Sequence, residues 1–349
     1  MKPATRTRTG EKPEGVQGAR RARRAQDAQD AMLVSAGARQ IRVTHPDRVL
    51  FPADGITKGQ LVRYYADVAG FLLPYVADRP LTLQRWPDGI EGFSFFEKQV
   101  PRGAPEWIPT TRQPSTGKRA LVDYPLCNDA AALLWFANLA AITLHVWMSK
   151  ASSIDVPEYL LFDLDPFEGC TIKTLAKVAR TVRDELSMLG LSPLVKTTGG
   201  KGFHVIVPLA PLYSYEQAQA FNELFAQHIR ALLPELVTLE RSKSKRTHGT
   251  VYFDWAQLGM GKTLVPPFVV RARPGAPVST PLEWSEVEAL EEKRSTKPTH
   301  DELRRWNMTT VPALLADRGD PWKKSFAPGA RLEGTLEKAR QLWGAHVGG

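Results

Sequence analysis

Two carboxylates, Asp163 and Asp165, interrupt an apolar stretch in the middle of the chain. The stretch reads Leu-Leu-Phe-Asp-Leu-Asp-Pro over residues 160–166, and apolar residues of this kind build a buried strand. Side chains alternate between the two faces of a strand, so both carboxylates point the same way. Such a pair repels and loses hydration unless a cation lies between its members, and its oxygen atoms suit Mg²⁺ or Mn²⁺. The alternative is a strand end at which both carboxylates face water.

A third carboxylate, Asp254, lies in a second strand-like run, Val-Tyr-Phe-Asp-Trp at residues 251–255. Three carboxylates from neighbouring strands can hold two divalent ions about 3.5–4 Å apart, the arrangement used for in-line phosphoryl or nucleotidyl transfer. One ion activates the attacking hydroxyl group, and the other neutralises the leaving pyrophosphate. The three aspartates are therefore the candidate catalytic residues and the candidate metal ligands.

A glycine-rich turn, Thr-Gly-Gly-Lys-Gly at residues 198–202, offers what a triphosphate needs. Glycines let phosphate oxygens approach the backbone closely, and Lys201 supplies a positive charge. The turn is not a Walker A loop, because Gly202 follows the lysine where that motif requires Ser or Thr. An ordinary hairpin turn is the alternative. His204, just beyond the turn, is either a donor to phosphate or a hydrogen-bonded core histidine.

Basic and aromatic side chains accompany these candidates. The loop Arg-Ser-Lys-Ser-Lys-Arg at residues 241–246 immediately precedes the third carboxylate strand, which favours contact with a nucleic-acid backbone over a solvated surface loop. Phe95 and Phe96 form either a platform for base stacking or part of the core. Arg271 and Arg273 end another apolar run, from which they can reach a triphosphate or a primer strand.

The elements that must position these residues alternate between strands and helices, which predicts an α/β or α+β protein with a mixed sheet. Helical periodicity and capping residues predict helices, and alternation predicts strands. The expected helices span 57–75, 128–145, 172–189, 215–233, 284–294 and 332–343, and the expected strands span 41–44, 81–86, 160–166 and 251–255, with a hairpin over 194–209.

Charge and composition divide the 349-residue chain. Residues 1–40 hold nine Lys or Arg, four Asp or Glu and no aromatic side chain, so we expect a disordered basic arm suited to phosphate contacts. Residues 41–325 form the expected catalytic domain, as two closely joined lobes, and residues 326–349 a C-terminal helix. The sequence has no apolar run of membrane length and no apolar signal-peptide core, and only two cysteines, which fits a cytoplasmic, nucleoid-associated protein without a membrane partner.

In this order, the motifs resemble the polymerase domain of bacterial ligase D, the repair polymerase of non-homologous end joining, in the archaeo-eukaryotic primase superfamily. The resemblance runs from about residue 41 to about residue 325. The matching stretches are Asp47–Pro52, Thr57–Gly59, Arg85–Gly89, Phe95–Lys98, Leu144–His145, Phe162–Pro166, Thr198–His204, Asp254–Trp255 and Arg271–Arg273.

The resemblance implies an archaeo-eukaryotic primase-type fold, with an RRM-like mixed-sheet catalytic palm and an N-terminal α/β lobe. It makes Asp163, Asp165 and Asp254 the ligands of two Mn²⁺ or Mg²⁺ ions. It also implies ribo- or deoxyribonucleoside triphosphate substrates, with ribonucleotides preferred. The implied nucleotide-binding residues are Phe96, His145, Thr198, Lys201, His204, Gln257 and Arg271, and the implied DNA-binding residues are Arg48 and Lys58, at a downstream 5′-phosphate, and Lys243 and Arg246, at template and primer.

Two local departures accompany the resemblance. Thr198 stands where the family usually has Ser, and residues 146–150 differ from the usual continuation after His145. Neither a ligase nor a nuclease domain is attached, so we expect either a stand-alone relative or an excised domain.

The implied function is a template-dependent polymerase with terminal transferase activity that fills gaps and extends ends of gapped or overhanging duplexes. Ku and a separate ATP-dependent DNA ligase are its possible partners. Three alternatives stay open: a primase that starts chains without a primer, a non-catalytic protein that bridges DNA ends, and a two-metal nuclease. The lack of a zinc module argues against the primase, and the complete carboxylate set against the bridging protein. A nuclease would not need residues that bind a triphosphate.

Overall fold

The computed structural model describes residues 31–115, 120–295, 299–325 and 329–343. The expected basic arm lies largely outside these residues, but its end at residue 40 needs correction. Residues 32–43 form an antiparallel hairpin of β1 (Met32–Ala36) and β2 (Arg39–Val43). The alternating apolar residues of this segment pack partly on the core, as Ile41 and Val43 show by being buried. The sequence there lacks aromatic residues, and this composition hid the strand pattern.

The palm lobe is built on a six-stranded sheet with the order β13–β14–β10–β12–β11–β16. All its strand pairs are antiparallel except β13 with β14, so the sheet is mixed, as expected. Its strands are β10 (Tyr159–Pro166), β11 (Leu194–Thr197), β12 (Phe203–Pro208), β13 (Val237–Thr238), β14 (Val251–Asp254) and β16 (Pro281–Leu282).

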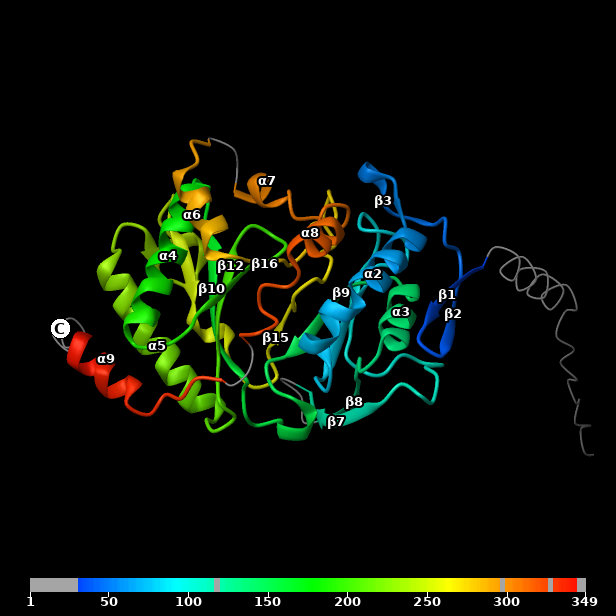
Figure 1. Ribbon diagram of the computed structural model, residues 1–349, viewed down its shortest axis with the longest axis horizontal. Helices are drawn as coiled ribbons and strands as arrows, with labels where there is room; N and C mark the ends of the chain where they lie inside the picture. Colours follow the sequence, from blue (N-terminus) through cyan, green and yellow to red (C-terminus); the bar gives the residue numbers. More distant parts are fainter. Residues whose placement is uncertain (1–30, 116–119, 296–298, 326–328, 344–349) are drawn as a thin grey trace, which may run out of the picture.

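Two helices cover one face of the palm sheet, α4 (Ile172–Met188) and α5 (Tyr215–Leu232) (Figure 1). The ring of Phe162 on β10 lies 4.9 Å from that of Phe225 on α5, so this phenylalanine faces the helices. Neighbouring positions on a strand face opposite ways, which directs Asp163 and Asp165 to the face that the helices leave uncovered. The helices thus fix which side of the sheet carries the carboxylates.

The N-terminal lobe is built on a four-stranded sheet with the order β15–β9–β5–β6. Its main helix, α2 (Lys58–Val76), begins at a capping box formed by Thr57 and Gln60. The strands are β5 (Leu81–Arg85), β6 (Phe95–Glu97), β9 (Ala141–Trp147) and β15 (Thr263–Leu264).

The expected helix over residues 128–145 is wrong in its second half. Helix α3 (Ala130–Asn138) ends early, and Ala140 adopts a positive φ of 55°, which a helix cannot continue. Strand β9 follows at once, because its Ile, Thr and Val residues favour a strand. His145 therefore lies on a strand of the N-terminal sheet.

One segment, residues 263–271, connects the two lobes. It pairs with the N-terminal sheet through β15 and accepts hydrogen bonds from Tyr64 Oη at Phe268 O (2.8 Å) and from Thr143 Oγ1 at Val270 O (2.9 Å). Arg271, at the end of this segment, donates to the carbonyl of Thr198 in the palm lobe at 3.1 Å. The two lobes are thereby held together at the edge of the carboxylate face.

Shorter elements complete the described chain. These elements are β3 (Val49–Phe51), β4 (Ile56–Thr57), β7 (Thr110–Pro114), β8 (Leu121–Pro125), α6 (Trp284–Glu292), α7 (Thr299–Leu303), α8 (Val311–Arg318) and α9 (Thr335–Trp343). Within the described residues, no helix is both long and apolar enough to cross a membrane.

Candidate active site

A row of four ionisable side chains crosses the open face of the palm sheet, and we name it the carboxylate row after its two aspartates. Asp163 lies directly opposite Asp254 of β14 on one side and His204 of β12 on the other. Lys196 of β11 lies opposite His204 and extends the row. Residues directly opposite each other in antiparallel strands project from the same face. The strand register, set by buried apolar pairs, thus gathers groups that are up to 91 positions apart in sequence, as Asp163 and Asp254 are.

Burial and repulsion between like charges disfavour the ionised forms of the side chains on this face. The pKa of Asp163 is raised to about 7, first by burial and then by the charge of Asp254. The pKa of Asp165 is raised to about 6, first by burial and then by Asp163. Burial also holds the pKa of His204 well below its ordinary value, with the charge of Lys196 adding to the effect. Carboxylates in such surroundings become fully ionised at neutral pH only when a cation joins them.

The donor atoms present suit a hard divalent cation. Asp163 Oδ1 is buried without a hydrogen-bond partner, although His204 Nε2 lies 3.4 Å away. Carboxylate oxygens are the ligands that Mg²⁺ and Mn²⁺ prefer. Among the residues that the structure describes, however, no three His, Cys, Asp or Glu side chains are close enough together to hold an ion as they stand. The carboxylate oxygens of the row are therefore the right ligand type for such an ion. The side chains would have to turn towards each other to bind it.

The glycine-rich turn joins β11 to β12 beside this row, as the expected hairpin predicted. Thr198 shapes the turn, because its Oγ1 accepts hydrogen bonds from the amides of Gly200 (3.1 Å) and Gly202 (3.3 Å). Burial raises the pKa of Asp165, and the charge of Lys201 partly offsets this rise. The ammonium group of Lys201 therefore lies near the carboxylate of Asp165. Arg271, whose pKa burial lowers to about 10, stands beside the turn through its bond to Thr198 O.

A hollow of about 400 Å³ opens next to the end of β14. Phe96 forms one wall with a side chain that is 59% exposed, so a flat ring is free to stack. His145 lies behind it, with ring centroids 5.4 Å apart, and burial followed by the charge of Arg271 lowers the pKa of this histidine to about 3. The hollow is lined by Thr82, Phe96, Lys98, Arg241, Asp254, Gln257, Gly261, Lys262 and Thr263.

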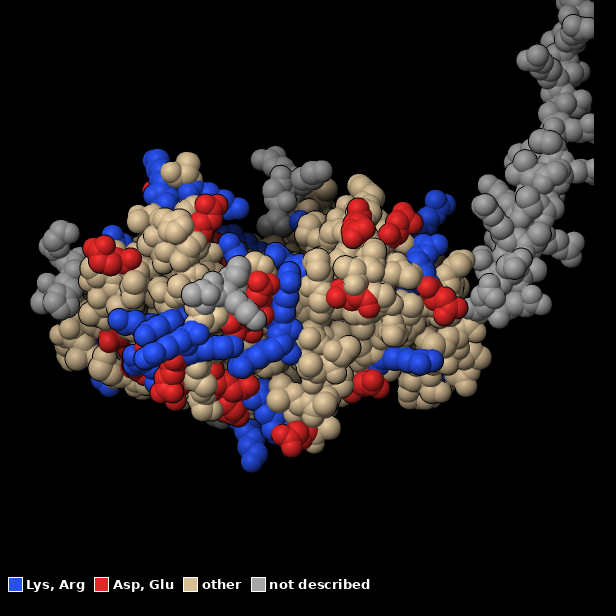
Figure 2. Space-filling view, turned by 90° about the horizontal axis from the view of Figure 1, so that it is seen from above, with Lys and Arg blue, Asp and Glu red and all other residues tan. Residues whose placement is uncertain are grey.

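The basic loop reaches the same site in part. The guanidinium of Arg246 lies 3.6 Å from the ring centroid of Tyr252, and that tyrosine is the cross-strand neighbour of Asp165. Lys243 lies on an exposed turn of the loop, and among the described residues no contact joins it to the carboxylate row. Figure 2 shows Lys and Arg side chains gathered across the middle of one face of the molecule.

Arg48 and Lys58 lie together in the N-terminal lobe, apart from the carboxylate row. Lys58 Nζ donates to Thr44 Oγ1 (3.3 Å) and Asn138 O (3.2 Å), and Arg48 donates to Pro87 O (2.8 Å). Burial, and then the charge of Arg48, lowers the pKa of Lys58 to about 8. Arg48 Nη1 also lies 3.8 Å from the exposed carboxylate of Asp88. Two neighbouring cations at the start of α2 suit an anion, since helix N-termini also favour negative charge.

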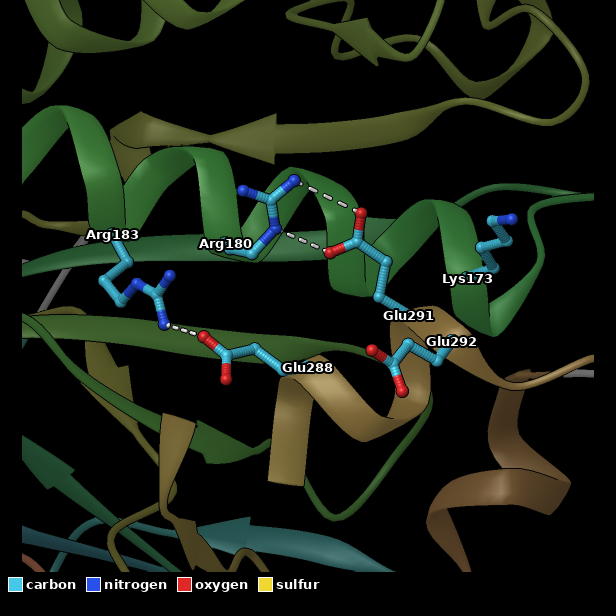
Figure 3. Close-up of a pocket in the computed structure, with 6 residues that line it drawn as sticks. All are labelled: Lys173, Arg180, Arg183, Glu288, Glu291 and Glu292. Atoms are coloured by element: carbon cyan, nitrogen blue, oxygen red, sulfur yellow. Dashed lines mark hydrogen bonds and ion pairs between the residues drawn. The ribbon is translucent and has the colours of Figure 1, made fainter. Parts of the chain in front are cut away.

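A second hollow lies between α4 and α6, and in it arginines of α4 are neutralised by glutamates of α6 (Figure 3). Arg180 binds both carboxylate oxygens of Glu291, at 2.7 and 3.3 Å, and Arg183 binds Glu288 at 2.6 Å. These ion pairs hold α4 against α6. Because both arginines are bound by glutamates of the protein itself, we assign the hollow no ligand.

Several residues of the site were not predicted from the sequence. Lys196 carries the same signal as the aspartates, a charge within an apolar strand, and could have been found by it. The others are Thr82, Lys98 and Lys262, whose residue types alone do not indicate a role. Arg241, which also lines the hollow, belongs to the basic loop that the sequence predicted to contact nucleic acid.

Comparisons with known proteins identify the family of this chain. The family model described as "LigD, primase-polymerase domain" matches residues 57–322. A multifunctional non-homologous end joining protein LigD of Mycolicibacterium smegmatis is 37% identical over 71% of this chain, and its Pseudomonas aeruginosa counterpart is 29% identical over 97%. These matches cover 32% and 38% of the two relatives, so the chain spans about a third of their length.

A solved structure shares the fold. The polymerase domain of Mycobacterium tuberculosis ligase D, in complex with DNA, has a TM-score of 0.74 and 32% sequence identity to this chain. The match covers 83% of this chain and 99% of that domain, and it confirms the expected primase-type fold. With a family model over most of its length and a similar fold, this chain belongs to the LigD primase-polymerase family.

Proposed function

We propose that the chain is a DNA-dependent nucleotidyltransferase that fills gaps and extends DNA ends during double-strand-break repair by non-homologous end joining. The observation that carries the proposal is the cross-strand pairing of Asp163 with Asp254, beside the glycine-rich turn and the hollow of Phe96. Family membership and the likeness to a DNA-bound polymerase domain support it. The relatives' own names place them in end joining.

In the proposed reaction, the 3′-hydroxyl of a primer attacks the α-phosphorus of a nucleoside triphosphate. A new P–O bond forms, the bond to the β-phosphate breaks, pyrophosphate leaves, and the hydroxyl proton passes to solvent. Two divalent ions, when bound by Asp163, Asp165 and Asp254, would supply the positive charge for attack and departure. Thr198, Lys201, His204 and Arg271 bind the triphosphate in this proposal, while Phe96, His145 and Gln257 hold the base and sugar.

The DNA-binding part of the proposal follows the position of the cations. Arg48 and Lys58 bind the 5′-phosphate on the far side of a gap, because the two cations lie together and apart from the carboxylate row. Arg246, and Lys243 on the same loop, bind the backbone of template and primer. We further propose that Mn²⁺ or Mg²⁺ supports activity, that ribonucleotides are preferred, that blunt or overhanging ends receive untemplated additions, and that the protein acts in the cytoplasm at the nucleoid. Ku and an ATP-dependent DNA ligase are its proposed partners.

The test uses gapped DNA with a downstream 5′-phosphate, Mn²⁺ and labelled nucleoside triphosphates, next to the double variant Asp163→Ala/Asp165→Ala. We expect templated extension by the wild type and none by the variant, which should still bind the DNA. Binding that depends on the 5′-phosphate without any extension by the wild type would instead support an end-bridging protein. Synthesis on a template without a primer would support a primase.

A further inference from the structure

A small pocket opens beside the glycine-rich turn, on the palm lobe and distinct from the hollow of Phe96. Its volume is about 190 Å³. One wall is the turn itself, another is the segment that follows Arg271, and the third is α7 (Thr299–Leu303) with the residue after it. The lining residues are Gly200, Lys201, Arg273, Pro274, Pro277, His300 and Arg304.

The pocket carries unneutralised positive charge. Within the described part of the chain, the side chains of Lys201 and Arg273 have neither a hydrogen bond nor an ion pair. Arg304 Nη1 and His300 Nε2 share a single carboxylate oxygen, Asp301 Oδ1, at 3.2 and 3.4 Å. This contrasts with the hollow of Figure 3, in which Arg180 and Arg183 are each bound by a glutamate. A concave site with several cations and one nearby carboxylate attracts an anion with more than one charge.

The pocket adjoins the residues proposed to bind the triphosphate. A Cβ atom placed on Gly200 would lie 3.8 Å from Arg273 Cζ, so this guanidinium stands directly over the turn. The charge of Arg273 lowers the pKa of Arg271, after the larger effect of burial. Lys201 forms part of the pocket and also acts on the carboxylate of Asp165. The same lysine therefore connects the carboxylate row to the pocket.

The walls of the pocket are anchored before any ligand arrives. Thr299 Oγ1 donates to Cys170 O at 2.9 Å, which ties α7 to the loop that follows the carboxylate strand. The opposite wall is fixed by backbone hydrogen bonds from Val278 N to Trp306 O (2.9 Å) and from Met308 N to Ala276 O (3.0 Å). A site whose backbone walls are already fixed loses less entropy when an anion binds.

We propose that this pocket binds the terminal phosphates of the incoming nucleoside triphosphate, and afterwards the pyrophosphate product, through Arg273, His300 and Arg304 together with Lys201. The inference rests on the proposed function and adds three binding residues: Arg273, His300 on α7, and Arg304 directly after that helix. It makes the pocket a recognition site for phosphate-chain length, since a monophosphate held at the carboxylate row would not extend into it.

The test compares the wild-type chain with Arg273→Ala/Arg304→Ala and with Arg304→Gln. Each protein is bound to gapped 5′-phosphorylated DNA whose primer lacks a 3′-hydroxyl, so that affinity for UTP and for UMP is measured in Mn²⁺ without turnover. We expect the double variant to bind UTP about tenfold more weakly, with UMP and DNA affinity unchanged. In extension assays with an ordinary primer, a higher concentration of inorganic pyrophosphate should be needed to inhibit the double variant.

Arg294→Ala is the matched control, because it removes one exposed arginine of the same lobe that does not line the pocket. Unchanged UTP affinity in both pocket variants would overturn the inference, as would a loss of DNA affinity in place of UTP affinity, which would make the pocket a DNA-phosphate site. Should the double variant fail to fold, Arg304→Gln decides alone, since its side chain is 43% exposed. A wild type that neither extends primers nor binds UTP would refute the proposed function itself.

Discussion

Asp163 and Asp254 face each other across neighbouring antiparallel strands, with His204 on the other side of Asp163. This arrangement places two like charges where a stability-optimised sheet would place apolar or oppositely charged partners. The energetic penalty falls on the metal-free protein, because burial and the charge of Asp254 outweigh the opposing charges of Lys196 and Arg271 at Asp163. Such a local loss of stability is expected where a site is built to bind a ligand.

The first prediction concerns the pH dependence of the metal-free protein. The folded-state pKa of Asp163 is about 7 against an ordinary value of 3.8, so the folded state holds its proton more tightly than the unfolded state. The contribution of this group to stability is full below pH 3.8 and is lost as pH rises through 7. Asp163→Asn should therefore raise the melting temperature by a few degrees at pH 8 and much less at pH 4, measured by calorimetry with chelator. Identical pH profiles of the two proteins would contradict this account.

A second prediction separates function from stability at Phe96. The ring is 59% exposed, so Phe96→Ala should leave the melting temperature almost unchanged. If a base stacks on it, its loss costs about 1–3 kcal/mol of binding and should raise KM for the nucleotide about tenfold. Steady-state kinetics on gapped DNA measures the effect. Met188→Ala, which removes another exposed apolar side chain (51%) from α4, should change neither quantity.

The sequence predicted the chemistry better than the geometry. Period-two alternation was enough to find Asp163, Asp165 and Asp254, because a charge within an apolar strand is visible locally. Their cross-strand partners were not predictable in this way. Register depends on the packing of strands far apart in sequence, so the alignment of His204 with Asp163 appears only in the fold.

Two other features escaped prediction for different reasons. Residues 128–145 are mostly apolar and lack a clear period, so one long helix was expected where a helix, a sharp turn at Ala140 and a strand occur. The pocket beside the glycine-rich turn combines Lys201 with Arg304, which belong to separate local elements that share no motif. Tertiary structure alone brings them together.

A third prediction concerns recognition of a 5′-phosphate by Lys58. Its pKa is lowered to about 8, so its charge diminishes as pH rises from 7 to 9. The preference for 5′-phosphorylated over 5′-hydroxyl gapped DNA should therefore fall over this range, as measured by fluorescence anisotropy at constant ionic strength. Lys58→Ala should show a weak preference at every pH. A wild-type preference that stays constant from pH 7 to 9 would show that this lysine keeps its charge or does not contact the phosphate.

The last prediction concerns the glycine-rich turn as a packed structure. A Cβ atom on Gly202 would lie 2.2 Å from Leu164 O, a backbone atom of the carboxylate strand that cannot move without shifting Asp163 and Asp165. Gly202→Ala should therefore destabilise the protein by roughly 3 kcal/mol or more and abolish nucleotide addition. Gly70→Ala is the matched control, because its Cβ meets nothing within 4 Å on helix α2 and alanine favours helices by about 1 kcal/mol. Chemical denaturation should give opposite signs for the two substitutions, and a neutral Gly202→Ala would mean that the turn is free to move away from β10.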